Sequence, residues 1–214
     1  MHRGIVATTF WVGEIFDPNA SDGSQVISTY DSSWMVHYGG CDGVPSSGGC
    51  ATEKRPAPTF FPLHMKPMQN PFYLDLPFDD LNNTAAFNQR CSVVPWANAP
   101  GYAGHCTDQS FSYMKNRWVK MTGTAGQVCY GQIEDAGPGQ YNDAAYVFGT
   151  NNASPLNARY GGAGMDVSPA LNSCLGMKEL NGDTDLLSWQ FVDASAVTPG
   201  PWKNLVTTSG VLNQ

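Results

Sequence analysis

Residues 117–135 restrict the possible folds more than any other part of the sequence. "RWVKMTG" and "VCYGQIED" are two runs rich in β-branched and aromatic residues, and the short segment "TAGQ" separates them. Two such runs joined by a short Gly-containing connection predict a β-hairpin. "LLSWQFVDA" (186–194) has the same composition and predicts a further strand. The second half of the chain is therefore expected to be mainly β-structure.

A short helix is predicted between these strands, within "GMDVSPALNSCLG" (164–176). Ser168 is a favoured N-cap residue, and Pro169 occupies the first helical position, where its missing N–H costs nothing. Gly176 stands where helices commonly end in a left-handed residue. The residues therefore predict a helix that starts at Ser168-Pro169 and stops at Gly176.

The first half of the chain carries weaker signals. "ATTFWVGEI" (7–15) and the segment 24–40 both predict strands, the second with a bend. Residues 41–71 are rich in Pro and Gly and predict a loop, and 71–81 predicts a short strand or an acidic turn. No internal repeat divides the 214 residues, so we expect one β-rich domain over 1–214.

The charge balance excludes several classes of partner. The chain has 11 basic and 18 acidic residues, a net charge of −7, and charged residues make up only 14% of it. Nucleic-acid binding requires clustered Lys and Arg, which are absent. No apolar run reaches the length of a membrane span, and the N-terminal run is broken by Glu14, unlike a signal peptide. We expect neither a nucleic-acid partner nor a membrane span.

Six cysteines, an even number without a CxxC motif, indicate disulfides in an oxidising compartment. Fifteen pairings are possible. Cys41 and Cys50 could close a local loop, as could Cys91 and Cys106, which would leave Cys129 and Cys174 for a long-range bridge. We therefore expect a secreted protein whose signal peptide is not part of this sequence.

The second half also resembles a known family. "RWVKMTGTAGQVCYGQIEDAGPG", "GMDVSPALNSCLGM" and "SWQFVD" follow one another as in the double-psi β-barrels of rare lipoprotein A, expansins and family-45 glycoside hydrolases. The resemblance implies an all-β fold with a six-stranded double-psi barrel, long decorating loops and a few short helices. It places the barrel core at about 24–40 and 117–193, with 41–116 as a loop-rich insertion. Ala136 and Glu134 depart from the Arg and Asn of rare lipoprotein A.

The same resemblance implies three catalytic residues. By position, Asp31 matches the base of family-45 enzymes and Asp166 matches the acid, while Asp135 matches the key Asp of lytic transglycosylases. Each also has a structural alternative: Asp31 as an exposed strand residue, Asp135 as a turn residue, and Asp166 as a helix-start residue. Strand alternation places Glu134 on the face opposite to Asp135.

Aromatic residues near these acids are candidates for stacking on sugar rings. We expect Tyr30, Trp34, Tyr141 and Tyr146 to bind substrate, and Trp118 and Trp189 to be core residues. Asp75, Asp79 and Asp80 fit no EF-hand spacing and predict a solvated turn. The four His residues are scattered and show no zinc motif, so neither a metal nor another cofactor is expected.

These observations predict a secreted, monomeric, endo-acting glycoside hydrolase. It would cleave a β-1,4-linked polysaccharide, a cellulose-type glucan, by carboxylate acid/base catalysis. Two alternatives stay open: a non-hydrolytic, expansin-like protein that binds and loosens cell-wall polysaccharide, and a lytic transglycosylase acting on peptidoglycan strands.

Overall fold

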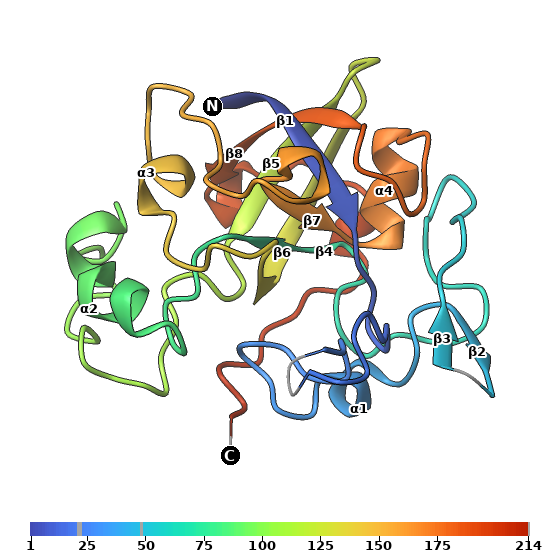
Figure 1. The fold of residues 1–214 in the computed structure, drawn as a ribbon, viewed down its shortest axis with the longest axis horizontal. Coiled ribbons are helices and arrows are strands. Elements are labelled where there is room, and N and C mark those ends of the chain that lie inside the picture. Colours follow the sequence, from blue (N-terminus) through green and yellow to red (C-terminus); the bar gives the residue numbers. More distant parts are fainter. Residues whose placement is uncertain (21–22, 48, 214) are drawn as a thin grey trace.

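A computed structural model describes residues 1–20, 23–47 and 49–213, and it contains a closed six-stranded β-barrel (Figure 1). The strands are β1 (His2–Thr9), β4 (Tyr73–Leu76), β5 (Trp118–Gly123), β6 (Val128–Ala136), β7 (Met165–Val167) and β8 (Leu186–Val192). Around the barrel they follow the order β1-β7-β4-β6-β5-β8. The pairs β1–β7 and β4–β6 are parallel and the other pairs are antiparallel.

Turn and capping residues in the sequence predicted the β5–β6 hairpin and helix α4 correctly. β5 and β6 pair from Trp118↔Gln132 to Thr122↔Val128, as predicted. Helix α4 spans Pro169–Leu175, and the Ser168 side chain accepts a hydrogen bond from the backbone N–H of Leu171. Gly176 ends the helix in the left-handed region with φ 67°.

The placement of a barrel strand in 24–40 is wrong. That segment forms isolated bridges and the short helix α1 (Trp34–Tyr38), in which Trp34 and Tyr38 share one buried face because residues four apart lie one above the other. The N-terminal segment supplies the barrel strand instead, as β1. The expected loop insertion 41–116 also contains a barrel strand, the fully buried β4.

Shorter elements decorate the barrel. They are the hairpin β2 (Val44–Ser46) and β3 (Gly49–Ala51), the helices α2 (Thr84–Val93) and α3 (Ala144–Val147), and the 3₁₀ turns Tyr160–Gly162, Ala194–Ala196 and Pro201–Lys203. In Figure 1, α2 and α3 lie on one side of the barrel, β2 and β3 lie on the other, and α1 lies below it. None of the described helices has both the length and the apolar character needed to cross a bilayer.

Three disulfides join Cys41 to Cys50, Cys91 to Cys106 and Cys129 to Cys174. The first two close local loops, and the third ties β6 to α4 across 45 residues of sequence. Disulfides persist in oxidising compartments, so this set is consistent with an extracellular protein.

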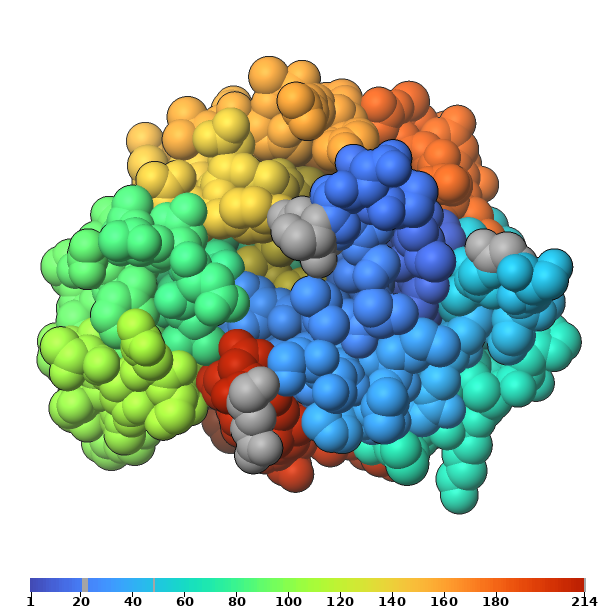
Figure 2. Space-filling model, turned by 60° about the horizontal axis from the view of Figure 1, so that its bottom comes forward, coloured from blue at the N-terminus to red at the C-terminus, as the bar shows by residue number. Residues whose placement is uncertain are grey.

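Two apolar clusters hold the molecule together. The larger one fills and surrounds the barrel; its strand residues include Ile5, Leu74, Val119, Met121, Ile133, Met165, Val167 and Trp189. The smaller one comprises Phe10, Val12, Trp34, Tyr38 and Tyr73 and packs the 24–40 segment against the end of the barrel. The space-filling view shows a hollow between the N-terminal segment, in blue, and the segment following β6, in yellow (Figure 2).

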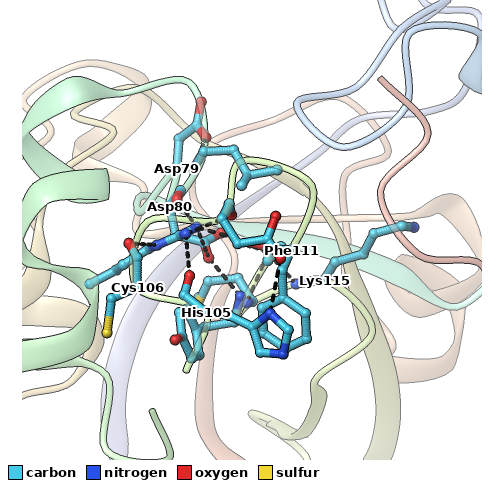
Figure 3. A network of polar contacts seen from close by, with 12 residues as sticks. Asp79, Asp80, His105, Cys106, Phe111 and Lys115 are labelled. Atoms are coloured by element: carbon cyan, nitrogen blue, oxygen red, sulfur yellow. Dashed lines mark hydrogen bonds and ion pairs between the residues drawn. The ribbon is translucent and has the colours of Figure 1, made fainter. Parts of the chain in front are cut away.

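Arg90 organises the α2 region through a network of polar contacts (Figure 3). This fully buried side chain donates to five backbone carbonyls, those of Asp80, His105, Cys106, Asp108 and Phe111, at 2.7–3.2 Å. The Asp80 carboxylate in turn accepts hydrogen bonds from Ser112 Oγ and the Tyr113 backbone N–H. One guanidinium thus joins Asp80, which precedes α2, to the loop between α2 and β5.

Replacing this guanidinium should be severely destabilising. In Arg90→Met the five carbonyls lose their donor and Asp80 loses the nearby positive charge, so we expect the free energy of unfolding to fall by about 3–5 kcal/mol. Urea denaturation measures this loss. Arg90→Lys keeps the charge with fewer donors and should lose less. A loss below about 1 kcal/mol in Arg90→Met would show that the network contributes little to stability.

Candidate functional site

A groove of about 1100 Å³ lies beside the ends of β1, β4 and β7. Its walls are the segment after β1, the loop after β6, and residues 156–160 and 181–183. The acidic residues that line it are Glu14, Asp17, Asp75, Asp166 and Asp183. Arg159 is the single basic residue among the described lining residues.

Three aspartates lie side by side on neighbouring strands next to the groove, and two of them, Asp75 and Asp166, line it. Asp75 on β4 pairs in register with Asp166 on β7 and, on its other side, with Asp135 on β6. The β4–β6 ladder shifts by one residue between Leu74 and Asp75, which brings Asp135 rather than Glu134 opposite Asp75. The register therefore sets three carboxyl groups in one row.

Asp75 and Asp166 are in direct contact. The Asp166 backbone N–H donates to Asp75 Oδ1 at 2.9 Å, and Thr8 Oγ1 donates to Asp166 Oδ1. The Oδ2 atoms both face Gly137, where an added Cβ would lie 2.6 Å from Asp75 Oδ2 and 3.6 Å from Asp166 Oδ2. The two Oδ2 atoms can be no farther apart than the sum of these distances. That limit is shorter than the ~6.5–9.5 Å between the carboxyls of inverting glycosidases. Only glycine fits at position 137 without displacing Asp75.

Burial favours the protonated form of these acids. It raises the pKa of Asp166 to about 8, helped by the charges of Glu14 and Asp135. Burial raises the pKa of Asp75 well above its usual range, and the charges of Asp166 and Asp135 add to this effect. Among the described residues, no Lys or Arg forms an ion pair with Asp75 or Asp166 that would reverse these shifts. Asp166 therefore holds a proton at neutral pH.

Glu14 is a further carboxyl group in the groove, beside Asp75 and Asp166. It follows β1 after a turn through Gly13, whose φ of 91° and contact with the Cys41–Cys50 bridge require glycine. Burial raises the pKa of Glu14 to about 7. The charge of Glu14 in turn raises the pKa of Asp166.

Aromatic rings stand exposed along the groove. Phe16 is 55% exposed, Tyr160 is 58% exposed and Tyr141 is 40% exposed. Tyr141 is the one predicted aromatic residue that lines the groove. Exposed aromatic rings can stack on the apolar C–H faces of sugars.

The other predicted aromatic residues have no ring face available to a substrate. Tyr30, Trp34 and Tyr146 are buried to within 1%. The Trp34 indole N–H donates to Gln69 Oε1, and the Tyr146 hydroxyl accepts from the Trp189 indole. Their expected role in substrate binding is therefore corrected to a structural one: adjacency in sequence to an acid does not determine which side of the chain a ring occupies.

The predicted acids separate in the structure. Asp166 lines the groove. Asp135 lies behind it, 7% exposed, and accepts from the backbone N–H groups of Thr29 and Ala136; burial raises its pKa to about 7. Asp31 is not among the lining residues, and its buried carboxylate contacts His37 Nδ1 at 2.8 Å and the Ser33 backbone N–H at 2.9 Å.

Asp31 is therefore misplaced as the base, because the segment that carries it is not a barrel strand. Glu134 also lies outside the groove lining and pairs with Lys115 Nζ at 2.6 Å.

Glu14 and Asp75 were missed as site residues. A signal existed for both: Glu14 ends the strand-like run "ATTFWVGE", and Asp75 interrupts the apolar run "FYLDL". A single carboxyl in an otherwise apolar strand indicates burial rather than the solvated turn assigned to Asp75.

The proton on Asp166 has a measurable consequence for stability. Between about pH 4 and pH 8 the folded chain retains a proton that an unfolded chain, with an ordinary pKa of 3.8, has released. The contribution of Asp166 to the free energy of unfolding therefore falls as the pH rises through this range. We expect Asp166→Asn to be more stable than the wild type at pH 8, with the advantage shrinking toward pH 4. Urea denaturation across this range tests it, and the exposed Asp193→Asn is the control. A pH-independent difference would contradict the assigned protonation.

Comparison of the chain with protein-family models, curated proteins and solved structures found no match. The functional assignment therefore depends on the chemistry of the groove.

Proposed function

We propose that this chain is a secreted glycoside hydrolase that cleaves internal β-1,4 linkages of a non-anionic polysaccharide, with Asp166 as the general acid. One observation carries the proposal: a buried carboxyl group, whose pKa burial raises to about 8, lines a groove that also has exposed aromatic rings. Cleavage of a glycosidic bond requires such a donor, because the departing oxygen must be protonated.

Thr8 contacts one oxygen of Asp166. Its hydroxyl bonds Oδ1, and we assign the proton to Oδ2, which lies on the side of Gly137. As the bond between the anomeric carbon and the leaving oxygen breaks, this proton passes to that oxygen. Asp166 becomes a carboxylate, which the Thr8 hydroxyl continues to stabilise.

Glu14 is the base in this mechanism. It lines the same groove, and the pKa of about 7 makes its ionised form available near neutral pH. The Glu14 carboxylate takes a proton from a water molecule, whose oxygen forms the new bond to the anomeric carbon. Asp75 is unsuited to this role because its Oδ2 lies too near that of Asp166 to admit the water. Its contact with the Asp166 N–H makes it a positioning residue.

The groove also indicates the kind of substrate. Three exposed rings from separate segments, Phe16, Tyr141 and Tyr160, line it, and such rings suit contact with several sugar units of one chain. Five acidic residues and one basic residue would repel an anionic polymer. The closed barrel with the parallel pairs β1–β7 and β4–β6 supports a double-psi barrel, and the three disulfides support secretion.

A lytic transglycosylase is the second candidate. The observation that favours it is the contact between Asp75 and Asp166, a pair of acids that could donate and recover one proton without activating water. Such an enzyme would leave anhydro ends on its products and would not depend on Glu14.

Product analysis separates these functions. Wild-type protein is incubated with β-1,4-glucan, amino-sugar polymers and peptidoglycan strands, and the products are identified by mass. Hydrolysis predicts water-added oligosaccharides, a loss of at least about 10³-fold in Asp166→Asn and a loss of about 10²–10⁴-fold in Glu14→Gln. Anhydro products with an active Glu14→Gln would establish the transglycosylase, and binding without products would support the expansin-like alternative.

The pH dependence of hydrolysis gives an independent test. Activity requires ionised Glu14 and protonated Asp166, so we expect a bell-shaped kcat/KM profile with its maximum between about pH 7 and pH 8. In Glu14→Gln the acidic limb should disappear from the residual activity, and the alkaline limb should move to lower pH because a charge that raises the pKa of Asp166 is gone. An optimum near pH 4–5 would contradict these assignments.

A further inference from the structure

We propose that Asn181 is a site of spontaneous chemical modification, at which the chain converts its own asparagine to an aspartyl or isoaspartyl residue through attack by the backbone nitrogen of Gly182. Residues 181–183 line the groove, so the modification changes the groove wall. The inference goes beyond the proposed function and does not depend on it, because it concerns the chemistry of the wall and not the reaction of a substrate.

Asn181 and Gly182 form the single Asn-Gly pair in the sequence. Glycine has no Cβ, so the backbone nitrogen that follows Asn181 is unobstructed and its backbone adopts conformations that are closed to other residues. Asn181 is exposed, and neither its side chain nor the Gly182 N–H has a hydrogen-bond partner among the described residues. Both reacting groups, the side-chain carbonyl carbon and the following nitrogen, are therefore free to meet.

Asn172 shows how the fold protects another asparagine. It is fully buried within α4, and its side chain donates to Thr9 Oγ1 at 2.8 Å and accepts from Lys54 Nζ at 2.9 Å. Rotation of that amide toward the next backbone nitrogen would break these bonds and the helix. Asn181 lies instead in the segment 180–183, which makes no backbone hydrogen bond within the described part of the chain. The rearrangement required of Asn181 therefore costs little.

Packing requires glycine at position 182. An added Cβ there would lie 2.7 Å from Glu179 Cβ, an atom too close to the main chain to swing aside. The main chain at Glu179 is itself held, because its N–H donates to Asp185 Oδ2 at 3.1 Å. Glu179 Oε2 is the atom nearest to that Cβ position, so the carboxylate lies against the Gly182 backbone. The fold thus keeps the reactive pair and places a base beside it.

The reaction needs no reagent other than water. The Glu179 carboxylate takes the proton of the Gly182 N–H, and the nitrogen forms a bond to Asn181 Cγ. The bond between Cγ and Nδ2 breaks, and Nδ2 leaves as ammonia with the proton that Glu179 returns, which closes a cyclic succinimide. Water then opens this ring at either carbonyl group and gives an aspartyl or an isoaspartyl residue at position 181.

The products change the groove wall in two ways. Each product adds one negative charge to the −7 of the chain, and the isoaspartyl product also adds a methylene group to the main chain. Gly161, next to the lining residue Tyr160, packs against the Asp183 carbonyl. A longer main chain at position 181 disturbs this contact.

Ageing of the intact protein tests this inference. The full chain is incubated in buffer near neutral pH, acidic forms are separated by ion exchange, and peptide mass spectrometry with an isoaspartyl methyltransferase assay locates the modified residue. We expect the wild type to accumulate a more acidic form modified at position 181. Its rate should be at least about one third of that in the chain unfolded in guanidinium chloride, because the site is open in the folded state. Asn181→Gln should not form this product, and Asn151→Gln, which replaces an exposed asparagine outside the groove lining, should age like the wild type.

Glu179→Gln keeps the shape of the side chain and removes the base. It should slow the modification at least about threefold in the folded chain and leave the rate in the unfolded chain unchanged. A folded rate below about one third of the unfolded rate would overturn the inference, since the fold would then protect the site. Modification only at positions other than 181 would overturn it too, and an unchanged folded rate in Glu179→Gln would overturn the assignment of the base. The readout is the mass and charge of the chain, so the presence or absence of glycan cleavage does not affect it.

Discussion

The antiparallel pairing of β4 with β7 is the constraint on which the rest of the site depends. It places Asp75 against Asp166, so that the backbone N–H of one residue donates to the carboxylate of the other. Burial raises the pKa of both acids, and the charge of Asp166 adds to this effect at Asp75. β-Sheet register, which sets the burial and the proximity of these side chains, thereby contributes to their protonation state.

Such a site lowers the stability of the fold, and other parts of the molecule offset this cost. Burying carboxyl groups without partner cations is unfavourable, and the row Asp135, Asp75 and Asp166 concentrates that burial at one end of the barrel. The opposing contributions come from the apolar barrel interior, from the disulfide between β6 and α4, and from the Arg90 network around the insertion. These supports lie away from the groove, which leaves its floor free for chemistry.

Local features of the chain were predictable from sequence, and its long-range contacts were not. The β5–β6 hairpin and α4 depend on neighbouring residues, and turn and capping signals identified both. The choice of the remaining barrel strands depends on partners far away, since β1 pairs with β7 and β8. Segments 7–15 and 24–40 have similar β-rich compositions, so composition could not decide between them. Asp166 was selected because the segment 164–176 resembles a family motif, whereas the burial of Asp75 appears only once β4 has its neighbours.

The position of Thr8 and Glu14 in the sequence has a consequence for how the protein folds during synthesis. Both belong to the N-terminal segment, yet the group they act on, Asp166, is more than 150 positions further along the chain. During synthesis the first strand must wait for β7 and β8 before it can enter the barrel. A nascent or truncated chain would have the hairpin and its local disulfides but no groove. The groove and its row of carboxyl groups would then assemble only at the final step of barrel closure.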